Sequence, residues 1–472
     1  MTDSYEFVII GGGSAGYAAA RTAHDLGLKT AVIDGAVTLG GLCILRGCMP
    51  SKSLIESANR NLTLRRAEEF GLSASNLSVH PEKIRDRKRV LIDDFAGYRQ
   101  GQLEDGRFDL FRGRASYVDA ETLLVKLNDG TETTIKAATS LIASGSVISR
   151  PPIVGLEETG YLVSDDVLDA AELPESIIVL GGGAIALEMA HYYEGLGVKT
   201  AVIQRSAQVL KSEDEDVAKA LEGAFIDRGI DLYTGTALKG VRVEDGKKVV
   251  SFEHEGEVKS VAADEILQAL GRQPNTGGLE LGAAGVNLNG RHVGTDEFQA
   301  TSAANIFAAG DVAGPHEVVH IAIEQGEAAA TNAAIHLGKL DPSKKVAISY
   351  ELKLFGVFTE PQVASVGLNE KEAKAAGIDV VTADYPFDDH GKSMVLGETH
   401  GFVKLLADRA TGKLIGGSVV GPHGSELIHE IVVALRYGAT AAEFARIPHY
   451  HPTLSEIWTY PAEDLMEACE GA

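Results

Sequence analysis

The sequence contains few cysteines, three in 472 residues, and two of them lie close together in the segment GGLCILRGCMPSK at residues 40–52. A zinc site at Cys43 and Cys48 would need two further ligands of suitable spacing, and only Cys469 remains. A purely structural disulfide is also disfavoured, because no secretion signal is visible. We expect a helical turn to bring Cys43 and Cys48 together as a reversible disulfide, with a helix N-terminus lowering a thiol pKa.

Positive charge is also scarce, with 43 Lys and Arg against 67 Asp and Glu and a formal net charge of −24. This balance argues against nucleic acid as a partner. No apolar run is long enough for a membrane helix, and the first residues show neither a basic region nor a cleavage site. We therefore expect a cytoplasmic protein with reduced thiols, no membrane partner and several domains.

A glycine-rich turn follows the first apolar run. Residues 7–10 (FVII) predict a buried parallel strand, and GGGSAG at residues 11–16 opens an alanine-rich helix over residues 17–26. The next strand is predicted over residues 30–33 and ends at Asp34. This order of strand, turn, helix, strand and acid is typical of a dinucleotide site.

Each glycine at the spacing of this turn has a physical reason for its residue type. Gly11 permits the tight turn, Gly13 lets a pyrophosphate approach the helix N-terminus, and Gly16 lets the helix pack closely on the strand. Asp34 is the acid expected to bind a ribose 2′-hydroxyl.

The pattern recurs in the second part of the chain, with IIVL at residues 177–180, GGGAIALE at 181–188 and a strand at 200–203. The sequence therefore predicts a second dinucleotide. Here Gln204 and Arg205 replace the acid, and Lys211 follows. This exchange favours NADPH, with its extra 2′-phosphate, over NADH.

Taken together, these motifs resemble the flavin-dependent disulfide reductase family, which includes dihydrolipoamide dehydrogenase, glutathione reductase and mercuric reductase. The resemblance covers nearly the whole chain. It also includes ASGS at residues 143–146, LGRQPN at 270–275, FAAGD at 307–311 and HPTLSE at 451–456. It implies FAD at the first site and the nicotinamide nucleotide at the second.

The resemblance implies an α/β fold class with two Rossmann-like dinucleotide-binding domains and a C-terminal α+β dimerisation domain. Residues 1–149 and 276–345 would form the FAD-binding part, and residues 150–275 the NAD(P)-binding domain between them. Residues 346–472 would form the dimerisation domain. Its strand-like runs flank a turn near residue 410, which indicates an antiparallel sheet.

The resemblance also assigns roles to the candidate catalytic residues. Cys48 would lie beside the flavin, and Cys43 would exchange with the substrate. Lys52 and Glu188 would form an ion pair near the flavin. His451 would be the general acid and base toward the thiols of the other subunit of a homodimer, and Glu456 would orient it.

The expected cofactor-binding residues are those of the glycine-rich turns and the family motifs. They are Gly11, Gly13, Ser14, Gly16, Asp34, Gly41, Ala143, Ser144, Gly145, Asp311, Gly181, Gly183, Ala186, Arg205, Lys211, Gly271 and Arg272.

The substrate is less clearly indicated than the type of reaction. The segment HIAIEQG at residues 320–326 and His449 resemble dihydrolipoamide dehydrogenases, and a lipoyl carrier is one possible partner. Arg21, and Arg205 together with Lys211, resemble positions of glutathione reductases. Glu327, however, stands where those enzymes carry Arg, and it would repel the carboxylate of the glutathione peptide. Both a dihydrolipoamide dehydrogenase-like activity and an NADPH-dependent reductase of small disulfides stay open.

Alternatives of other classes fit less well. Mercuric reductases lack the catalytic His and end in paired cysteines, and a transhydrogenase, oxidase or binding protein would not need Cys43 and Cys48.

The third thiol, Cys469, has no second redox atom beside it, and Glu467 and Glu470 should raise its pKa. We expect it to be a bystander rather than a C-terminal relay.

Overall fold

The computed structural model describes residues 3–470 and divides the chain into two compact units. The first unit contains the residues up to 51, 86–149 and 272–349, and the second contains 52–85, 150–271 and the residues from 350 onward. The chain passes between the units five times, and the first two of these crossings lie within helices α3 (Cys48–Arg65) and α4 (Pro81–Leu103). Among the described residues, no helix is long and apolar enough to cross a membrane.

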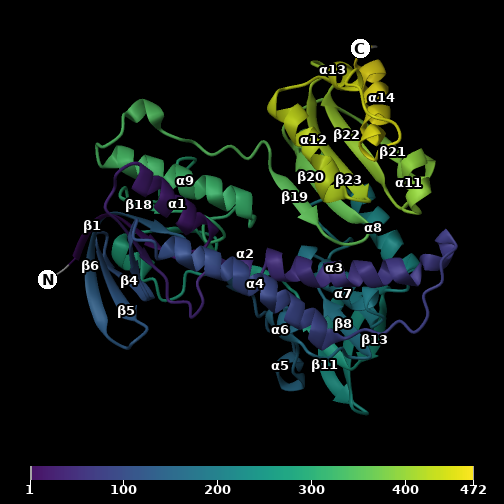
Figure 1. Cartoon of the computed structure of the whole chain (residues 1–472), viewed down its shortest axis with the longest axis horizontal. Coiled ribbons are helices and arrows are strands. Elements are labelled where there is room, and N and C mark those ends of the chain that lie inside the picture. Colours follow the sequence, from purple (N-terminus) through teal and green to yellow (C-terminus); the bar gives the residue numbers. More distant parts are fainter. Residues whose placement is uncertain (1–2, 471–472) are drawn as a thin grey trace. The chain divides into compact units, whose positions relative to one another are not determined.

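A seven-stranded sheet forms the centre of the first unit (Figure 1). Its order is β3-β2-β1-β6-β5-β4, and β18 also pairs with β6. Strands β1, β2, β3, β6 and β18 run parallel, while β4 and β5 form an antiparallel extension. The bounds are β1 (Asp3–Ile10), β2 (Thr30–Ile33), β3 (Asp109–Phe111), β4 (Gly113–Asp119), β5 (Thr122–Leu127), β6 (Glu132–Ile142) and β18 (Ile306–Ala308).

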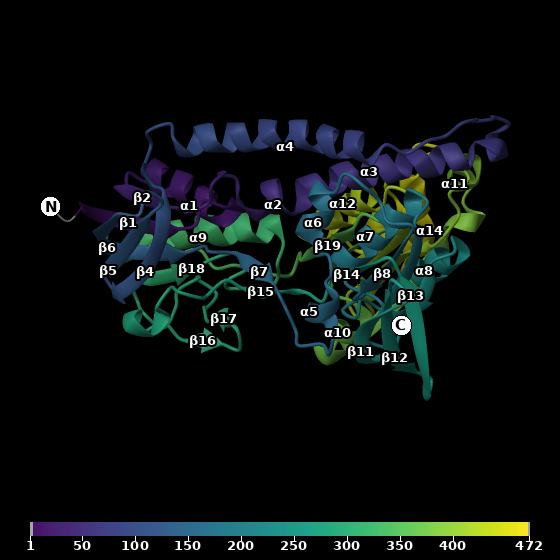
Figure 2. The same cartoon turned by 90° about the horizontal axis from the view of Figure 1, so that it is seen from below.

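Two alanine-rich helices, α1 (Ser14–Asp25) and α9 (Val319–His336), pack against each other in this unit. Small side chains allow the close approach: a Cβ on Gly326 of α9 would lie 2.2 Å from the carbonyl oxygen of Ala15. Figure 2 shows two short strand pairs of the same unit. They are β7 (Ser146–Ile148) with β15 (Arg272–Pro274), and β16 (Leu288–Asn289) with β17 (His292–Val293).

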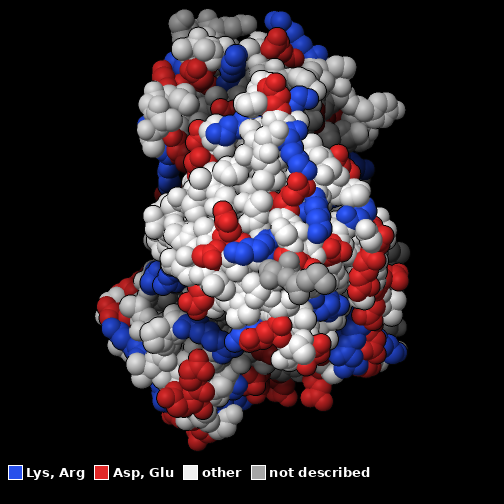
Figure 3. Space-filling view, turned by 90° about the vertical axis from the view of Figure 1, so that its left-hand side faces the viewer, with Lys and Arg blue, Asp and Glu red and all other residues white. Residues whose placement is uncertain are grey.

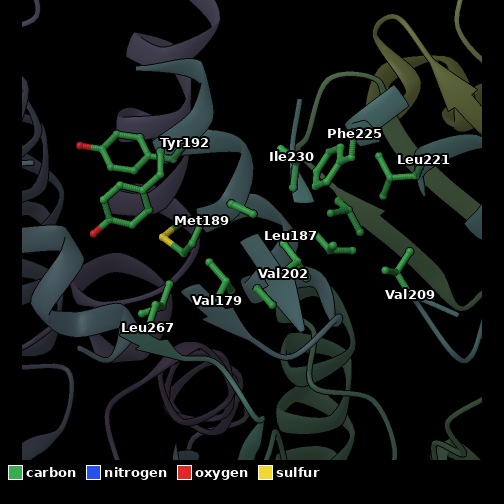
Figure 4. Packing of buried hydrophobic residues seen from close by; sticks show 14 of the residues in the cluster. Val179, Leu187, Met189, Tyr192, Val202, Val209, Leu221, Phe225, Ile230 and Leu267 are labelled. Atoms are coloured by element: carbon green, nitrogen blue, oxygen red, sulfur yellow. The ribbon is translucent and has the colours of Figure 1, made fainter. Parts of the chain in front are cut away.

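The second unit contains another parallel sheet, in the order β10-β9-β8-β14, and an antiparallel sheet of β11, β12 and β13. Helices α7 and α8 supply apolar side chains that pack with this parallel sheet, as Figure 4 shows for Leu187, Phe225 and Val202. The bounds are α5 (Leu156–Thr159), α6 (Ser164–Asp169), β8 (Ser176–Leu180), α7 (Ala184–Gly195), β9 (Lys199–Ile203), α8 (Glu215–Asp227), β10 (Asp231–Tyr233), β11 (Ala237–Glu244), β12 (Lys247–His254), β13 (Glu257–Ala263) and β14 (Glu265–Gln268).

The C-terminal part of this unit is a five-stranded antiparallel sheet in the order β19-β20-β23-β22-β21, as the strand-like runs predicted. Helix α12 packs on β20 and β23, and α14 packs on β21 and β22. The bounds are β19 (Leu354–Val357), β20 (Gln362–Gly367), α10 (Glu370–Ala375), β21 (Val380–Pro386), α11 (Gly391–Leu396), β22 (Phe402–Asp408), β23 (Leu414–Gly421), α12 (Gly424–Arg436), α13 (Ala441–Ala445) and α14 (Thr459–Glu470). The α/β fold class predicted from the sequence is confirmed, while the predicted bounds of the FAD-binding, NAD(P)-binding and dimerisation domains stay a prediction.

A buried lysine links this sheet to the start of α8, the helix that packs with the parallel sheet of the same unit. Lys404, 2% exposed on β22, donates from Nζ to Asp214 Oδ2 at 2.9 Å, to Asp216 Oδ2 at 2.8 Å and to Glu370 Oε1 at 3.1 Å. The three carboxylates lie close enough together to suit a cation, and the ammonium compensates their charge. Despite burial, the hydrogen bonds to Asp216 and Asp214 raise the pKa of Lys404.

Lys404→Met should lower the free energy of unfolding by about 3 kcal/mol, because Asp214 would be left buried and unpaired. Since the pKa of Lys404 is raised, this contribution is present at neutral pH and is lost only in strongly alkaline solution. Denaturant titration measures the loss. The control is Lys374→Met, which removes an exposed lysine paired with the same Glu370 and should change stability by less than about 0.5 kcal/mol. Equal effects of both variants would show that burial of the lysine is irrelevant.

Candidate active site

The backbone of the first glycine-rich turn packs so closely that no side chain would fit at two of its glycines. Gly11 has φ +108°, and a Cβ on it would lie 2.3 Å from the carbonyl oxygen of Ala143. A Cβ on Gly16 would lie 1.8 Å from the carbonyl oxygen of Gly11. Gly13 is the N-cap of α1, and no side chain caps that helix end. The first N–H groups of α1 therefore offer a ready site for a phosphate, beside Ser14.

Asp34 closes the same turn from the end of β2. Its Oδ2 accepts a 2.8 Å hydrogen bond from the N–H of Gly12, and its Oδ1 accepts one of 2.8 Å from Ala36. A carboxylate can accept about four hydrogen bonds, so Asp34 keeps acceptor capacity for a ribose hydroxyl.

The cysteine-bearing helix α2 (Gly41–Leu45) begins directly against this turn. Gly41 has φ +74°, and a Cβ on it would lie 2.5 Å from Cα of Gly13. Cys43 follows two residues later. The first candidate thiol is thus anchored next to the first glycine-rich turn by backbone packing.

The two cysteines do not lie on one helix, which corrects the prediction of a single helical turn. Cys43 lies within α2, and Cys48 is the first residue of α3. The intervening Gly47 packs so closely that a Cβ there would lie 3.2 Å from Cα of Cys43. The break at residues 46–47 therefore places Cys48 at a helix N-terminus, where the helix dipole favours a thiolate.

A polar network joins three of the family motifs within the first unit. Ser144 Oγ donates to the carbonyl oxygen of Asn275 at 2.8 Å, and the N–H of Asn275 donates to the carbonyl oxygen of Gly145 at 2.9 Å.

The Asp311 carboxylate belongs to the second part of this network. Ser146 Oγ donates to Asp311 Oδ2 at 2.6 Å and accepts from Arg272 Nε at 2.8 Å. The N–H of Ala143 bonds the carbonyl oxygen of Ile10 at 2.9 Å. Arg272 thus belongs to the Asp311 cluster, and Gly271 precedes it with φ +105°.

The second glycine-rich turn repeats the geometry of the first. A Cβ on Gly181 would lie 2.4 Å from the carbonyl oxygen of Ala269, while the space around Gly183 is open to 4 Å. Gly183 is the N-cap of α7, again without a side-chain cap, and Ala186 is fully buried. Both turns therefore fit a dinucleotide through an open backbone and an uncapped helix end.

The two cations predicted to recognise a 2′-phosphate lie just after β9. Arg205 and Lys211 are both exposed, and neither forms a salt bridge with the described residues. Gln204 Oε1 accepts the N–H of Arg205 at 3.1 Å. The end of β9 therefore carries positive charge without a compensating acid.

Lys52, one turn after Cys48 on α3, forms the predicted pair with Glu188. Its Nζ lies 2.9 Å from both carboxylate oxygens, and Glu188 Oε1 also accepts the N–H of Phe358 at 3.1 Å. The ammonium lies 4.6 Å from the centre of the Phe358 ring. Glu188 is 4% exposed, so this lysine compensates a nearly buried carboxylate.

His451 and Glu456 also come together as predicted. His451 Nδ1 lies 3.0 Å from Glu456 Oε2 and 3.1 Å from Oε1. The His451 side chain is 79% exposed, whereas that of Glu456 is 11% exposed. A largely buried carboxylate thus holds one nitrogen of an imidazole that is itself mostly exposed.

Three contacts were not predicted from the sequence. His390 lies completely buried beside Glu456, and no motif surrounds it. His449 Nε2 lies 2.7 Å from Glu430, which makes its imidazole part of a separate pair. Arg21 Nη2 donates to Glu327 Oε1 at 2.6 Å. In the sequence, Arg21 suggested a glutathione reductase-like substrate, whereas Glu327 argued against one. The salt bridge joins these two residues.

Cys469 packs against the core of the C-terminal sheet. Burial raises the pKa of its thiol, Asp408 raises it further and Arg409 opposes the rise. The predicted direction was therefore right, but burial is the main cause. The side chain of Glu470, to which the sequence assigned part of the effect, lies outside the described residues.

Charges of both signs are interspersed over the face drawn in Figure 3. Lys and Arg form no continuous basic surface there, which agrees with the excess of acid in the sequence.

Two glycine-rich dinucleotide turns, a cysteine pair at a helix start and an imidazole–carboxylate pair define a nucleotide-dependent redox enzyme. Residues 5–326 match the model of the family described as pyridine nucleotide-disulphide oxidoreductase, and residues 355–462 match the dimerisation domain of that family. The chain belongs to the pyridine nucleotide-disulphide oxidoreductase family. It is a flavoprotein disulfide oxidoreductase that uses FAD and a pyridine nucleotide, and its dimerisation domain implies a homodimer.

Full-length relatives support this assignment. The chain is 34% identical to a dihydrolipoyl dehydrogenase of Geobacillus stearothermophilus, covering 99% of this chain and 96% of the relative. The crystal structure of LpdA from Mycobacterium tuberculosis matches with a TM-score of 0.86 and 29% identity over 98% of this chain and all of that one. The HOCl-induced flavoprotein disulfide reductase RclA from Escherichia coli, in a Cu(II) complex, matches with a TM-score of 0.85 and 25% identity over 98% and 99% of the two chains.

Proposed function

We propose that this protein exchanges electrons between a nicotinamide nucleotide and a small dithiol or disulfide, most like a dihydrolipoyl dehydrogenase. The observation that carries the proposal is the packing of Gly41 on Gly13, which anchors the Cys43 helix against the FAD-binding turn. Cys48 at the start of α3 supplies the second sulfur. The full-length similarity to dihydrolipoyl dehydrogenases supports the choice of substrate class.

The proposed reaction runs through thiol–disulfide exchange. When bound, FAD and the nicotinamide nucleotide supply the two electrons that open the Cys43–Cys48 disulfide. The Cys43 thiolate then attacks one sulfur of the substrate disulfide, forms a mixed disulfide and releases one thiolate. The partner subunit's His451 gives a proton from Nε2 to that leaving thiolate.

Cys48 completes the exchange. Its thiolate attacks the sulfur of Cys43, breaks the mixed disulfide and releases the second substrate thiol, so the Cys43–Cys48 disulfide is restored. The helix N-terminus at Cys48 would favour the thiolate form of that sulfur. Oxidation of a dithiol is the same sequence in reverse.

An anaerobic steady-state assay tests the choice of substrate. We expect lipoamide with a nicotinamide nucleotide to give the highest kcat/KM, above glutathione disulfide and cystine. Glutathione disulfide should be disfavoured because Glu327 already neutralises Arg21, which leaves that pair a poor carboxylate site. A kcat/KM for glutathione disulfide equal to or above that for lipoamide would contradict the proposal and favour the alternative below.

The alternative is an NADPH-dependent reductase of a small disulfide, and the positive end of β9 favours it. Arg205→Glu should weaken NADPH use by about ten- to hundredfold, since a charge-assisted contact contributes about 1.5–3 kcal/mol. NADH use should rise or stay level. The ratio of kcat/KM values for the two nucleotides measures the effect.

Lys199→Glu is the matched control, because Lys199 is exposed at the opposite end of the same strand. It should leave the nucleotide ratio within about twofold, as expected for an exposed charge far from the phosphate. A wild-type enzyme that already prefers NADH strongly would show that Arg205 is only a solvated surface residue.

A further inference from the structure

The carboxylate of Glu456 lies between two imidazoles, of which only one is accounted for by the proposed function. His390 is the N-cap residue of α11 and is 0% exposed. Its Nδ1 lies 2.8 Å from Ser393 Oγ, and its Nε2 lies 3.4 Å from Glu456 Oε1. In the described structure, Nε2 is buried without a hydrogen-bond partner, and Glu456 is the carboxylate that faces it.

We propose that His390 is a positioning residue, whose neutral imidazole donates its Nε2–H to Glu456 and fixes the carboxylate toward His451. The inference rests on the proposed role of His451 as general acid and base. A movement of a few tenths of an ångström would turn the 3.4 Å contact into a hydrogen bond, and catalytic contacts often tighten when substrate binds.

The surroundings of His390 keep its ring neutral and select one tautomer. Burial lowers its pKa, while Glu456 opposes that effect. The rings of Phe387 and Tyr460 lie edge-on to the imidazole, each with its centre 6.4 Å away. A neutral ring with its lone pair at Nε2 would face the carboxylate unfavourably, so Nε2 carries the proton and Nδ1 accepts the Ser393 hydroxyl.

The titratable and charged groups around this imidazole are few. Glu456 and His451 face it from the segment of residues 451–456, and Tyr460 faces it from α14. Asp389, the preceding residue, accepts the hydroxyl of Tyr385, which stacks on Tyr460. No lysine or arginine contact to His390 is found among the described residues, so Glu456 is the dominant charge.

His390 therefore shares the carboxylate with His451. The N–H donated to Oε1 withdraws charge from the carboxylate, and the carboxylate in turn holds the His451 imidazolium less tightly. Removal of that donor should have two effects: the carboxylate holds the His451 imidazolium more tightly, and it loses its fixed orientation.

The test is His390→Leu in the FAD-loaded full-length enzyme, with kcat/KM for lipoamide measured from pH 5.5 to 9.5. We expect about a tenfold loss at neutral pH and an upward shift of about half a unit in the alkaline limit of the pH profile, because Glu456 without the His390 donor holds the imidazolium more tightly. His390→Gln, which retains an N–H donor, should restore most of both properties. Ser393→Ala should give a smaller shift in the same direction, since the tautomer is then less strongly fixed.

Two controls separate this inference from other effects. His449→Gln removes an imidazole near His451 that pairs with Glu430 instead, and it should leave the alkaline limit unmoved. Thermal unfolding of each variant reports structural damage. A folded His390→Leu enzyme whose alkaline limit moves by less than 0.2 units overturns the proposal, as does the absence of any recovery in His390→Gln. By contrast, full activity of His451→Ala would refute the proposed function itself.

Discussion

Cys48→Ser should reduce turnover of every disulfide substrate by at least about 10³-fold, equal to about 4 kcal/mol of barrier. Without the second sulfur, the mixed disulfide at Cys43 cannot be resolved internally, and no disulfide remains to accept the electron pair. Single-turnover assays should show one released thiol per subunit at most. The hydroxyl of serine is close in size to the thiol, so the start of α3 should stay intact.

The control is Cys469→Ser, which removes the one cysteine outside the segment of residues 40–52. Burial raises the pKa of the Cys469 thiol, and this makes it a poor nucleophile. Turnover should therefore stay within about twofold of wild type. If Cys469→Ser lost activity tenfold or more, the C-terminal tail would have to be part of the electron path.

His451→Gln should lower kcat/KM for disulfide reduction by about 10²–10⁴-fold, the usual contribution of a general acid or base. The loss should be greatest with substrates whose leaving thiol has a high pKa, since those need the proton most. Measurement of kcat/KM across a series of aromatic disulfides of graded thiol pKa tests this dependence.

His449→Gln is the matched control for this variant, because His449 lies two residues away and pairs with Glu430. It should retain at least half of the wild-type activity. A His451→Gln enzyme whose loss does not depend on the leaving thiol would argue against proton transfer by this residue, even if activity fell.

Local sequence patterns predicted the parts of the site that are contiguous in the chain. The strand and turn around Gly11 were predictable because a buried apolar run and a glycine fingerprint have a strict period and spacing. The Lys52–Glu188 and His451–Glu456 pairs followed from a resemblance to known enzymes rather than from the residues alone. Their geometry agrees with that expectation.

Contacts between distant segments were not predictable in the same way. Gly47, where the helix breaks, packs closely on Cys43, whereas spacing alone suggested one helical turn. His390 is far from Glu456 in sequence and belongs to no motif, so only the folded C-terminal sheet brings them together. Likewise, nothing local to Arg21 indicates its salt bridge with Glu327.

If Cys43 and Cys48 form the redox-active pair, the redox state of the three thiols must follow that of the enzyme. The oxidised enzyme and the enzyme reduced anaerobically with one equivalent of nicotinamide nucleotide are each alkylated under denaturing conditions, digested and analysed by mass spectrometry. We expect a Cys43–Cys48 linkage in the oxidised sample and alkylation of both cysteines only after reduction, with Cys469 alkylated in both samples. Alkylation of Cys43 and Cys48 to the same extent in the two samples would contradict this pairing.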